Sequence, residues 1–442
     1  MEVHYVPRPR RRPAGAVPGR PGQARRRCRP VLRRLARRLT ASMPPRPPSQ
    51  DGRIPPIIFL GFLAAMGPLA LSIHVQSIPA ISAAFDASYA RAQFTVSAFL
   101  LSFAASQLIV GPLSDRFGRK PVLYGGLLLF GLASAGGAMA ESLELLIVAR
   151  VLQGAGGCAT LVVPRAVVQD THHGVEAARV MAFVAILQST APSIAPVLGG
   201  GIDALFDWRG IFWFLTILSV LATLGVNYWL RETRPLTGGQ PDRWGTIFIR
   251  YASLFRSRLY IGYTIAFTFG TSGFFGFLAV GPALLIETRG LDPIWFSICL
   301  TLITSQFVIG NYTASRLVRR FGIDRVLVAG VVGEAAAALL LLGLSGEIAI
   351  AAVVAPVMLY SYFNGYIFAN GIAGATGIDP RVAGSAASFL GFAQLGIGAV
   401  TAFAMSRLPL DTILPYAITL FLVSALAGVG MLLVRTAQRP GA

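Results

Sequence analysis

Charged residues are scarce in this sequence. Of its 442 residues only 13% are Asp, Glu, Lys or Arg, and 54% are hydrophobic. An average water-soluble protein carries about 25% charged residues. The shortage excludes an ordinary soluble protein for most of the chain, and it predicts that long stretches lie in a lipid bilayer.

Lysine and cysteine are nearly absent as well. The single lysine is Lys120, so the phosphate-binding loop of an ATP-driven pump, which needs a lysine after a glycine-rich turn, is missing. Cys28, Cys158 and Cys299 stand far apart and form neither a metal-ligand pattern nor a disulfide framework. No Ser/His/Asp arrangement stands out. We therefore expect no enzyme, no metal and no cofactor.

The net charge of +19 comes mostly from the first fifty residues, which hold fourteen Arg and one Glu. This basic segment, residues 1–53, has too few apolar side chains to fold alone. Three interpretations remain open: a disordered cytoplasmic tail on anionic lipid, a targeting peptide, or upstream sequence with Met43 as the true start. We favour the third. No aromatic residues are interleaved with its arginines for base stacking, so no nucleic-acid partner is expected.

Apolar stretches of roughly 18 to 25 residues recur from Ile54 onward, each long enough to cross a bilayer. They predict an all-α polytopic membrane protein with twelve transmembrane helices. A polar linker at 231–258 divides the spans into two six-helix halves, at 54–230 and 259–434, and residues 435–442 form a short tail. The expected spans are 54–75, 94–113, 121–140, 143–164, 179–201, 210–230, 259–286, 294–314, 326–344, 348–371, 384–405 and 412–434.

Basic residues are distributed unevenly between these spans. The loops and tail on the side of the N-terminus hold 18 Lys or Arg, whereas the other side holds four, namely Arg91, Arg209, Arg289 and Arg407. Cytoplasmic loops carry an excess of Lys and Arg. Both termini are therefore predicted to lie in the cytoplasm, with the chain in the inner (plasma) membrane.

A compact charged turn separates the second and third spans: Gly111-Pro112-Leu113-Ser114-Asp115-Arg116-Phe117-Gly118-Arg119-Lys120-Pro121. Its Arg-Phe-Gly core returns 204 positions later as Arg320-Phe321-Gly322, which indicates two repeated halves. The turn resembles the signature loop, roughly G-x-L-x-D-R-x-G-R-[KR], of the major facilitator superfamily of secondary transporters. The resemblance implies the major facilitator fold, with two pseudo-symmetric halves and substrate bound between them.

In that family the loop aspartate docks on the start of span 11 and on the loop arginine, and so locks the inner gate. The resemblance carries this role to Asp115, with the start of span 11 near Gly384. The expected gating residues are Gly111, Asp115, Arg116, Gly118, Arg119 and Lys120. The alternative is that these charges only orient the chain in the membrane.

The fourth span contains a charge well inside the membrane. Arg150 lies about eight residues, ~12 Å, from the start of the span, where a charge is costly and indicates function. The segment Arg150-Val151-Leu152-Gln153-Gly154-Ala155-Gly156 resembles the R-x-x-Q-G-x-G motif of proton-coupled members. The resemblance implies that Arg150, with Gln153 and Gly154, takes part in proton coupling. The alternative is an arginine that snorkels to the membrane surface.

The fifth span reads Ala191-Pro192-Ser193-Ile194-Ala195-Pro196-Val197-Leu198-Gly199-Gly200. Prolines inside a spanning helix bend it, and glycines allow close contact with a neighbour. With Pro192, Pro196, Gly199 and Gly200, the stretch resembles the antiporter motif of bicyclomycin- and chloramphenicol-type efflux proteins, in the drug:proton antiporter branch. Trp208-Arg209-Gly210-Ile211-Phe212 and Arg231-Glu232-Thr233-Arg234-Pro235 resemble the same group. A structural kink alone is the alternative.

The first span departs from that group. Where the group carries a pattern like D-x-Y-x-P-A-x-P, this chain has Ser72 at the aspartate position and His74 at the tyrosine position, when aligned on Pro79. The usual proton-carrying carboxylate is absent. His74 and Glu334, the one carboxylate well inside the second-half spans, are the titratable replacements. For each, a hydrogen-bonded structural role is the alternative.

These features predict a monomeric secondary transporter whose partners are the bilayer, protons and a small-molecule substrate. The combined resemblance implies export of small, partly apolar compounds by proton antiport with alternating access. Two alternatives stay open: an exporter of other metabolites or a uniporter of the same superfamily, and a non-transporting receptor or scaffold on the same fold.

Overall fold

The computed structural model describes residues 55–172, 174–233, 252–347, 349–378, 383–408 and 412–438. The predicted basic segment at 1–53, most of the predicted linker, and residues 439–442 lie outside the described residues. All that follows concerns the described part of the chain.

The described chain is helical, and no strand occurs within it. The first half contains α2 (Ile57–Ser72), the 3₁₀ turn η1 (Val75–Ser77), α3 (Ile78–Ala84), α4 (Tyr89–Phe117), α5 (Arg119–Ala138), α6 (Leu143–Thr171) and α7 (Gly174–Trp229). The second half contains α9 (Arg258–Pro282), the π-helical turn η2 (Ala283–Glu287), α10 (Pro293–Phe321), α11 (Ile323–Gly343), α12 (Ile350–Thr376), α13 (Ala383–Met405) and α14 (Leu414–Ala437).

Eleven helical segments of the described chain are long and apolar enough to cross a membrane. The longest, α7, has 56 residues and would measure about 84 Å if straight, more than twice the hydrocarbon thickness. It is broken at Asp207, whose φ of 59° and ψ of −177° are not helical. The Asp207 carboxylate accepts a hydrogen bond from the Arg209 amide at 2.6 Å, as at the start of a new helix. Counting both parts of α7 gives the twelve spans that were predicted.

The first span is longer than predicted. Helix α2 ends at Ser72, but the chain continues through η1 and α3 to Ala84 before it turns. The predicted end at residue 75 therefore falls at a break inside the span. This break places His74 in the interior of the structure, where it is 1% exposed.

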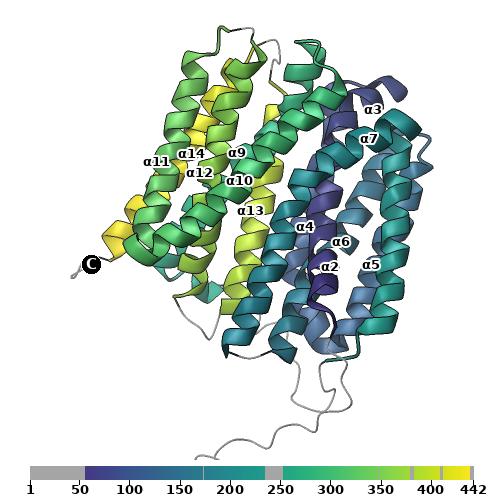
Figure 1. The fold of residues 1–442 in the computed structure, drawn as a ribbon, viewed down its shortest axis with the longest axis vertical. Coiled ribbons are helices and arrows are strands. Elements are labelled where there is room, and N and C mark those ends of the chain that lie inside the picture. Colours follow the sequence, from purple (N-terminus) through teal and green to yellow (C-terminus); the bar gives the residue numbers. More distant parts are fainter. Residues whose placement is uncertain are drawn as a thin grey trace, which may run out of the picture. The chain divides into compact units, whose positions relative to one another are not determined.

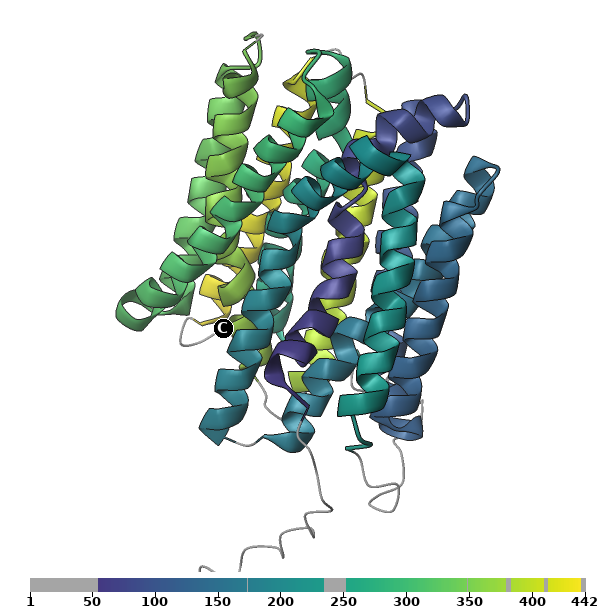
Figure 2. The same cartoon turned by 45° about the vertical axis from the view of Figure 1, so that its right-hand side comes forward.

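The internal repeat is visible in the backbone. Helices α4 and α10 each have 29 residues, with bounds 204 positions apart, and each is followed by a glycine with positive φ. Gly118 has φ 98° and Gly322 has φ 79°, a conformation that other residues rarely adopt. The purple-to-teal helices of the first half and the green-to-yellow helices of the second lie on different sides of the bundle (Figures 1 and 2). The predicted all-α fold with two pseudo-symmetric halves is confirmed.

We call the end of the bundle at Gly118 and Gly322 the loop end. Some contacts between the halves lie at the opposite end. There the Tyr89 hydroxyl donates to the Ala279 carbonyl at 2.7 Å, and the rings of Phe94 and Phe403 lie 5.8 Å apart. One hydrophobic core joins the first half to the opposite-end parts of all six second-half helices, α9 to α14, whereas the loop-end part of the second half has a core of its own. The halves are thus joined at the end opposite the loops, and α4 also touches α13 nearer the loop end, where a Cβ on Gly391 would overlap Gln107 Oε1.

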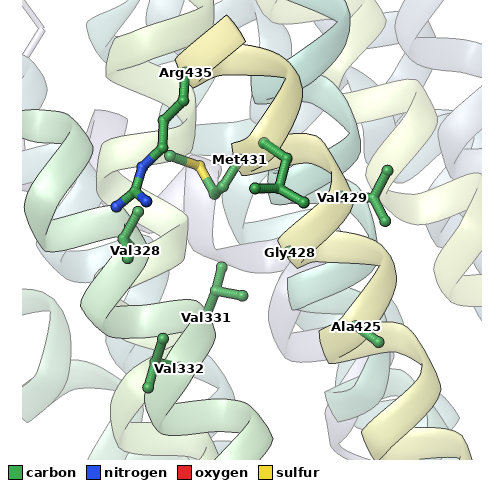
Figure 3. A pocket seen from close by; sticks show the side chains of 9 residues that line it. Val328, Val331, Val332, Ala425, Gly428, Val429, Met431 and Arg435 are labelled. Atoms are coloured by element: carbon green, nitrogen blue, oxygen red, sulfur yellow. The ribbon is translucent and has the colours of Figure 1, made fainter.

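The outer surface of the bundle is apolar. Leucine and valine side chains such as Leu132, Val332 and Leu432 are at least 60% exposed, as expected for residues that face lipid. A groove of about 330 Å³ runs between α11 and α14, lined by apolar side chains with Arg435 at one end (Figure 3). Arg435 is in the last turn of α14, near the level expected for lipid headgroups. This groove contains none of the residues predicted to couple transport.

Candidate functional site

The loop after α4 is held by a carboxylate from a distant part of the chain. Glu232, just beyond α7, accepts hydrogen bonds from the Arg119 amide at 2.9 Å and the Lys120 amide at 3.0 Å. These are two of the unpaired donors at the start of α5, where the helix dipole also favours negative charge. A Cβ on Gly118 would lie 2.6 Å from Glu232 Oε2, so glycine is needed there for space as well as for backbone conformation.

The Arg119 side chain connects three groups on two helices. Its Nη1 pairs with Asp115 Oδ1 at 2.6 Å and donates to Ser114 Oγ at 2.7 Å, while Nε donates to Asp170 Oδ2 at 2.9 Å. The guanidinium is buried, with 9% of the side chain exposed, and it is neutralised by a carboxylate on each side. Thr233 donates to the same Asp170 oxygen at 3.2 Å. We call Asp115, Arg119, Asp170 and Glu232 the loop network.

Sequence reasoning placed Asp115 and Arg119 in this network but missed two of its members. Asp170 lies in the last turn of α6 and belongs to no motif that the sequence analysis singled out. Glu232 belongs to a stretch that was noticed only for its resemblance to efflux proteins. The other predicted gating residues lie around the network: Gly111 next to Val162 of α6, Arg116 over the Phe117 ring, and Lys120 over the Tyr124 ring.

The ion pair that the structure records for Asp115 lies within the first half. An added Cβ on Gly384 would meet no atom within 4 Å. The recorded ion pair of Asp115 is with Arg119 on the next helix. The predicted docking of Asp115 on span 11 therefore stays a prediction for another access state.

Arg150 is the most deeply buried charge of the first half. It is 0% exposed on α6 and reaches carbonyls on two other helices: Nη1 donates to Ala70 O at 3.3 Å, and Nε donates to Thr95 O at 3.3 Å. Ala70 lies two residues before α2 ends, where backbone carbonyls lack helical partners. The guanidinium carbon lies 4.2 Å from the centre of the Phe99 ring, a cation–π contact. The Arg150 side chain therefore points into the bundle and does not snorkel to the membrane surface.

Gln153 and Gly154 support Arg150. Gln153 accepts a hydrogen bond from Arg150 Nη1 and donates to Ser134 Oγ at 2.7 Å, which connects α6 to α5. A Cβ on Gly154 would lie 2.5 Å from the Phe99 carbonyl oxygen, so this glycine lets α4 approach α6 closely. Gln153 therefore orients the arginine, and Gly154 allows close approach of α4, the helix that carries Phe99.

His74 lies beside Arg150 at the break in the first span. Its backbone has φ −110° and ψ 2°, between α2 and η1. Neither ring nitrogen makes a hydrogen bond of good geometry within the described residues. The ring of Phe212 lies 6.1 Å from the His74 ring and 6.0 Å from the Arg150 guanidinium carbon, so both groups face the same aromatic side chain. Ser72, one residue before this break, also has an unpartnered hydroxyl.

The glycines of the fifth span contact two different neighbours. A Cβ on Gly199 would overlap the carbonyl oxygen of Ile73, next to His74 in the first span. A Cβ on Gly200 would lie 2.6 Å from Ser297 Oγ on α10, in the second half. Pro192 and Pro196 lie earlier in α7 and leave its backbone helical, because the non-helical residue is Asp207. The motif therefore acts by close packing at the end opposite the loops.

Glu334 belongs to a separate cluster inside the second half. It is 0% exposed on α11, and its Oε1 accepts a hydrogen bond from Asn364 Nδ2 at 3.0 Å. Asn364 and Tyr360, both on α12, also donate to the Gly270 carbonyl of α9, at 3.0 and 2.9 Å. The structure thus brings His74, Arg150, Gln153 and Gly154 together and keeps Glu334 in the other half. The described residues contain no cluster of His, Cys, Asp and Glu suited to a metal.

Comparison with known proteins agrees with this geometry. Residues 58–404 match the family model described as Major Facilitator Superfamily. The chain belongs to the Major Facilitator Superfamily. It is therefore a multi-pass membrane transporter with a small-molecule substrate, as members of this family are transporters rather than enzymes.

Several curated relatives align over most of their length. The chain is 30% identical to an uncharacterized MFS-type transporter, YdgK, of Bacillus subtilis, covering 80% of this chain and 89% of the relative. It is 26% identical to a bicyclomycin resistance protein homolog of Haemophilus influenzae, covering 82% and 92%. It is also 26% identical to multidrug resistance protein D of Escherichia coli, covering 76% and 85%.

Among solved structures, the chain resembles a bacterial homologue of the human lysosomal transporter Spinster in an inward-facing, unoccupied conformation. The TM-score is 0.64 at 12% identity, over 87% of this chain and 98% of that one. At this identity the likeness concerns the fold alone.

Proposed function

We propose that this transporter exports small, partly apolar compounds, including antibiotics, in exchange for protons. The observation that carries the proposal is the cluster of Arg150, Gln153 and His74, which places a fully buried cation beside a titratable imidazole at a break in the first span. Buried ionisable groups in membrane spans are costly and serve proton or substrate pathways. Relatives named for bicyclomycin and multidrug resistance support a drug-like substrate.

The loop end is proposed to face the cytoplasm, with both termini there, in the inner membrane. The excess of Lys and Arg on that side supports this orientation. Contacts between the halves then close the outer end, which corresponds to an inward-facing state of a monomer. In the outward-facing state, Asp115 of the loop network docks on the start of α13 and closes the cytoplasmic end.

Protons and substrate compete in the proposed cycle. Substrate binding favours one access state and protonation of a membrane group favours the other, so their exchange drives export. Two groups are proposed as proton carriers. His74 faces Phe212 beside Arg150, and Glu334 is held by Asn364 in the second half. Ser72 stands where the related transporters have a proton-carrying carboxylate, so one of these two groups carries the proton instead.

Proton release from purified protein in weakly buffered detergent tests this proposal. A panel of antibiotics is added to the wild type and to the variants His74→Ala, Glu334→Gln and Arg150→Ala. Release that disappears in His74→Ala or Glu334→Gln identifies the carrier. Glu144→Gln is the matched control, because Glu144 is exposed and pairs only with Arg91 among the ion pairs described.

The absent span-1 carboxylate also favours a second function, a passive carrier of the same superfamily. A compound that binds without releasing protons between about pH 6 and 8, where an imidazole ordinarily titrates, supports this uniporter and contradicts antiport. Flux of that compound into proteoliposomes then separates a carrier from a receptor or scaffold, which binds without transport.

A further inference from the structure

The membrane interior of the first half contains more positive charge than its acidic groups balance. Helix α6 carries both Arg150 and Arg165. The ion pairs described join Arg91 to Glu144, and Arg119 to Asp115 and Asp170, and none reaches either arginine of α6. The recorded polar partner of the Arg165 side chain is the neutral Gln188, 2.6 Å from Nη2.

Arg150 also keeps donors that nothing in the described structure uses. Among the described residues, neither its Nη2 nor the two ring nitrogens of His74 make a hydrogen bond of good geometry. These groups face the same Phe212 ring, so they border one small region of the interior. Buried donors without partners are costly, and a buried charge is normally paired. The missing partner is therefore expected to be an anion that comes from outside the protein.

Ser72 brings no negative charge to the part of the first span near Arg150. It lies two residues after Ala70, whose carbonyl contacts Arg150, and its own buried hydroxyl is unpartnered. A serine is smaller than an aspartate and leaves Arg150 without a neighbouring carboxylate in the first span. Arg165 lies on the same helix, about 22 Å nearer the loop end, and is partly exposed. Helix α6 thus carries two positive charges, one deep in the membrane and one nearer the loop end.

We propose that the substrate is an organic anion whose carboxylate, or a similar acidic group, binds Arg150 and His74, with its apolar part near Phe212. This inference rests on the proposed export function and narrows its substrate class. Arg165 attracts the acidic group as it enters from the loop end. A charge-assisted bond to the guanidinium gives the preference for acid over neutral analogues.

Three probes with the same apolar body test the proposal: 4-butylbenzoate, 4-butylbenzamide and 4-butylbenzylamine. Their binding to the purified full-length protein in detergent is measured by calorimetry, with and without added sodium chloride. We expect the benzoate to bind at least about tenfold more tightly than the amide, with the amine weakest. Equal binding of benzoate and amide refutes the proposal. A preference that vanishes on adding chloride assigns the site to an inorganic anion and also refutes it.

A charge placed in the protein provides the matched test. Ser72→Asp supplies the missing carboxylate and should weaken benzoate binding by about tenfold or more, whereas Ser72→Asn, of the same size without the charge, should retain the preference. Arg165→Gln is a second variant, away from the tightly packed region, and should weaken benzoate binding by a smaller factor. Unchanged benzoate affinity in both Ser72→Asp and Arg165→Gln overturns the proposal.

Proton release separates this inference from the proposed function. If neutral antibiotics bind and release protons but benzoate binds no more tightly than the amide, proton antiport is supported and the anionic substrate class is refuted. If benzoate is preferred and no compound releases protons, the substrate class stands and antiport falls.

Discussion

Three consecutive glycines in the fifth span have different surroundings, and this permits a controlled prediction. A Cβ on Gly199 would overlap the Ile73 carbonyl, a Cβ on Gly200 would lie 2.6 Å from Ser297 Oγ of the other half, and a Cβ on Gly201 would meet nothing within 4 Å. Each alanine variant gains the same helix propensity, about 0.8–1 kcal/mol. Differences among the three variants therefore report the contacts alone.

The magnitudes follow from what each added methyl group meets. Overpacking of a well-packed site costs about 1–3 kcal/mol. In Gly199→Ala this cost falls within the first half, against backbone that cannot rotate away, so the thermal midpoint in detergent should fall. In Gly200→Ala the cost arises only while the halves touch, so closure of the end opposite the loops should be disfavoured by about 5- to 150-fold. Gly201→Ala should be as stable as wild type or slightly more so.

Crosslinking measures closure of the end opposite the loops. Phe94 and Phe403, whose rings are 5.8 Å apart, are replaced by cysteine in a background without the three native cysteines, and the crosslinking rate is recorded. The rate should fall in Gly200→Ala and recover when Ser297→Ala removes the atom that is met. If the rate in Gly200→Ala equals that in Gly201→Ala, or does not recover in the Gly200→Ala/Ser297→Ala double variant, Gly200 is not part of the contact between the halves.

Three further predictions concern the loop network. Glu232→Ala removes the cap from α5, at a cost of about 1–2 kcal/mol, so amide exchange in the first turn of α5 should quicken by about 5- to 30-fold; exchange at wild-type rate would exclude the cap. Gly118→Ala should destabilise more than Gly322→Ala in thermal unfolding, because both residues have positive φ but only Gly118 is crowded by Glu232, whereas equal losses would indicate backbone strain alone. Arg119→Gln leaves two carboxylates without their shared cation, and Asp170→Asn in the same chain should restore part of the lost thermal stability; no restoration would contradict the network.

The site was predictable where a residue type alone signals its role. An arginine eight residues into an apolar span is rare, so Arg150 was found without a structure. The Gln153-Gly154 pair that follows it in the motif identified the residues that support it. Asp170 and Glu232 could not be found in this way, because acidic residues at helix ends are common. Only the fold shows that both reach the same short segment around Gly118 and Arg119. The break at Asp207 inside α7 falls between the spans predicted at 179–201 and 210–230, although the sequence did not single out Asp207 itself.

The sequence by itself determined the number and class of the spans, since a bilayer requires about twenty apolar residues per helix whatever their neighbours are. It also determined the repeat, because a turn with positive φ needs glycine at both Gly118 and Gly322. Tertiary structure alone decided which side chains meet. Whether Gly199 faces Ile73, whether His74 and Arg150 share Phe212, and whether Arg150 has an acidic neighbour all depend on packing between helices far apart in the chain. Such contacts leave no periodic signal in the sequence.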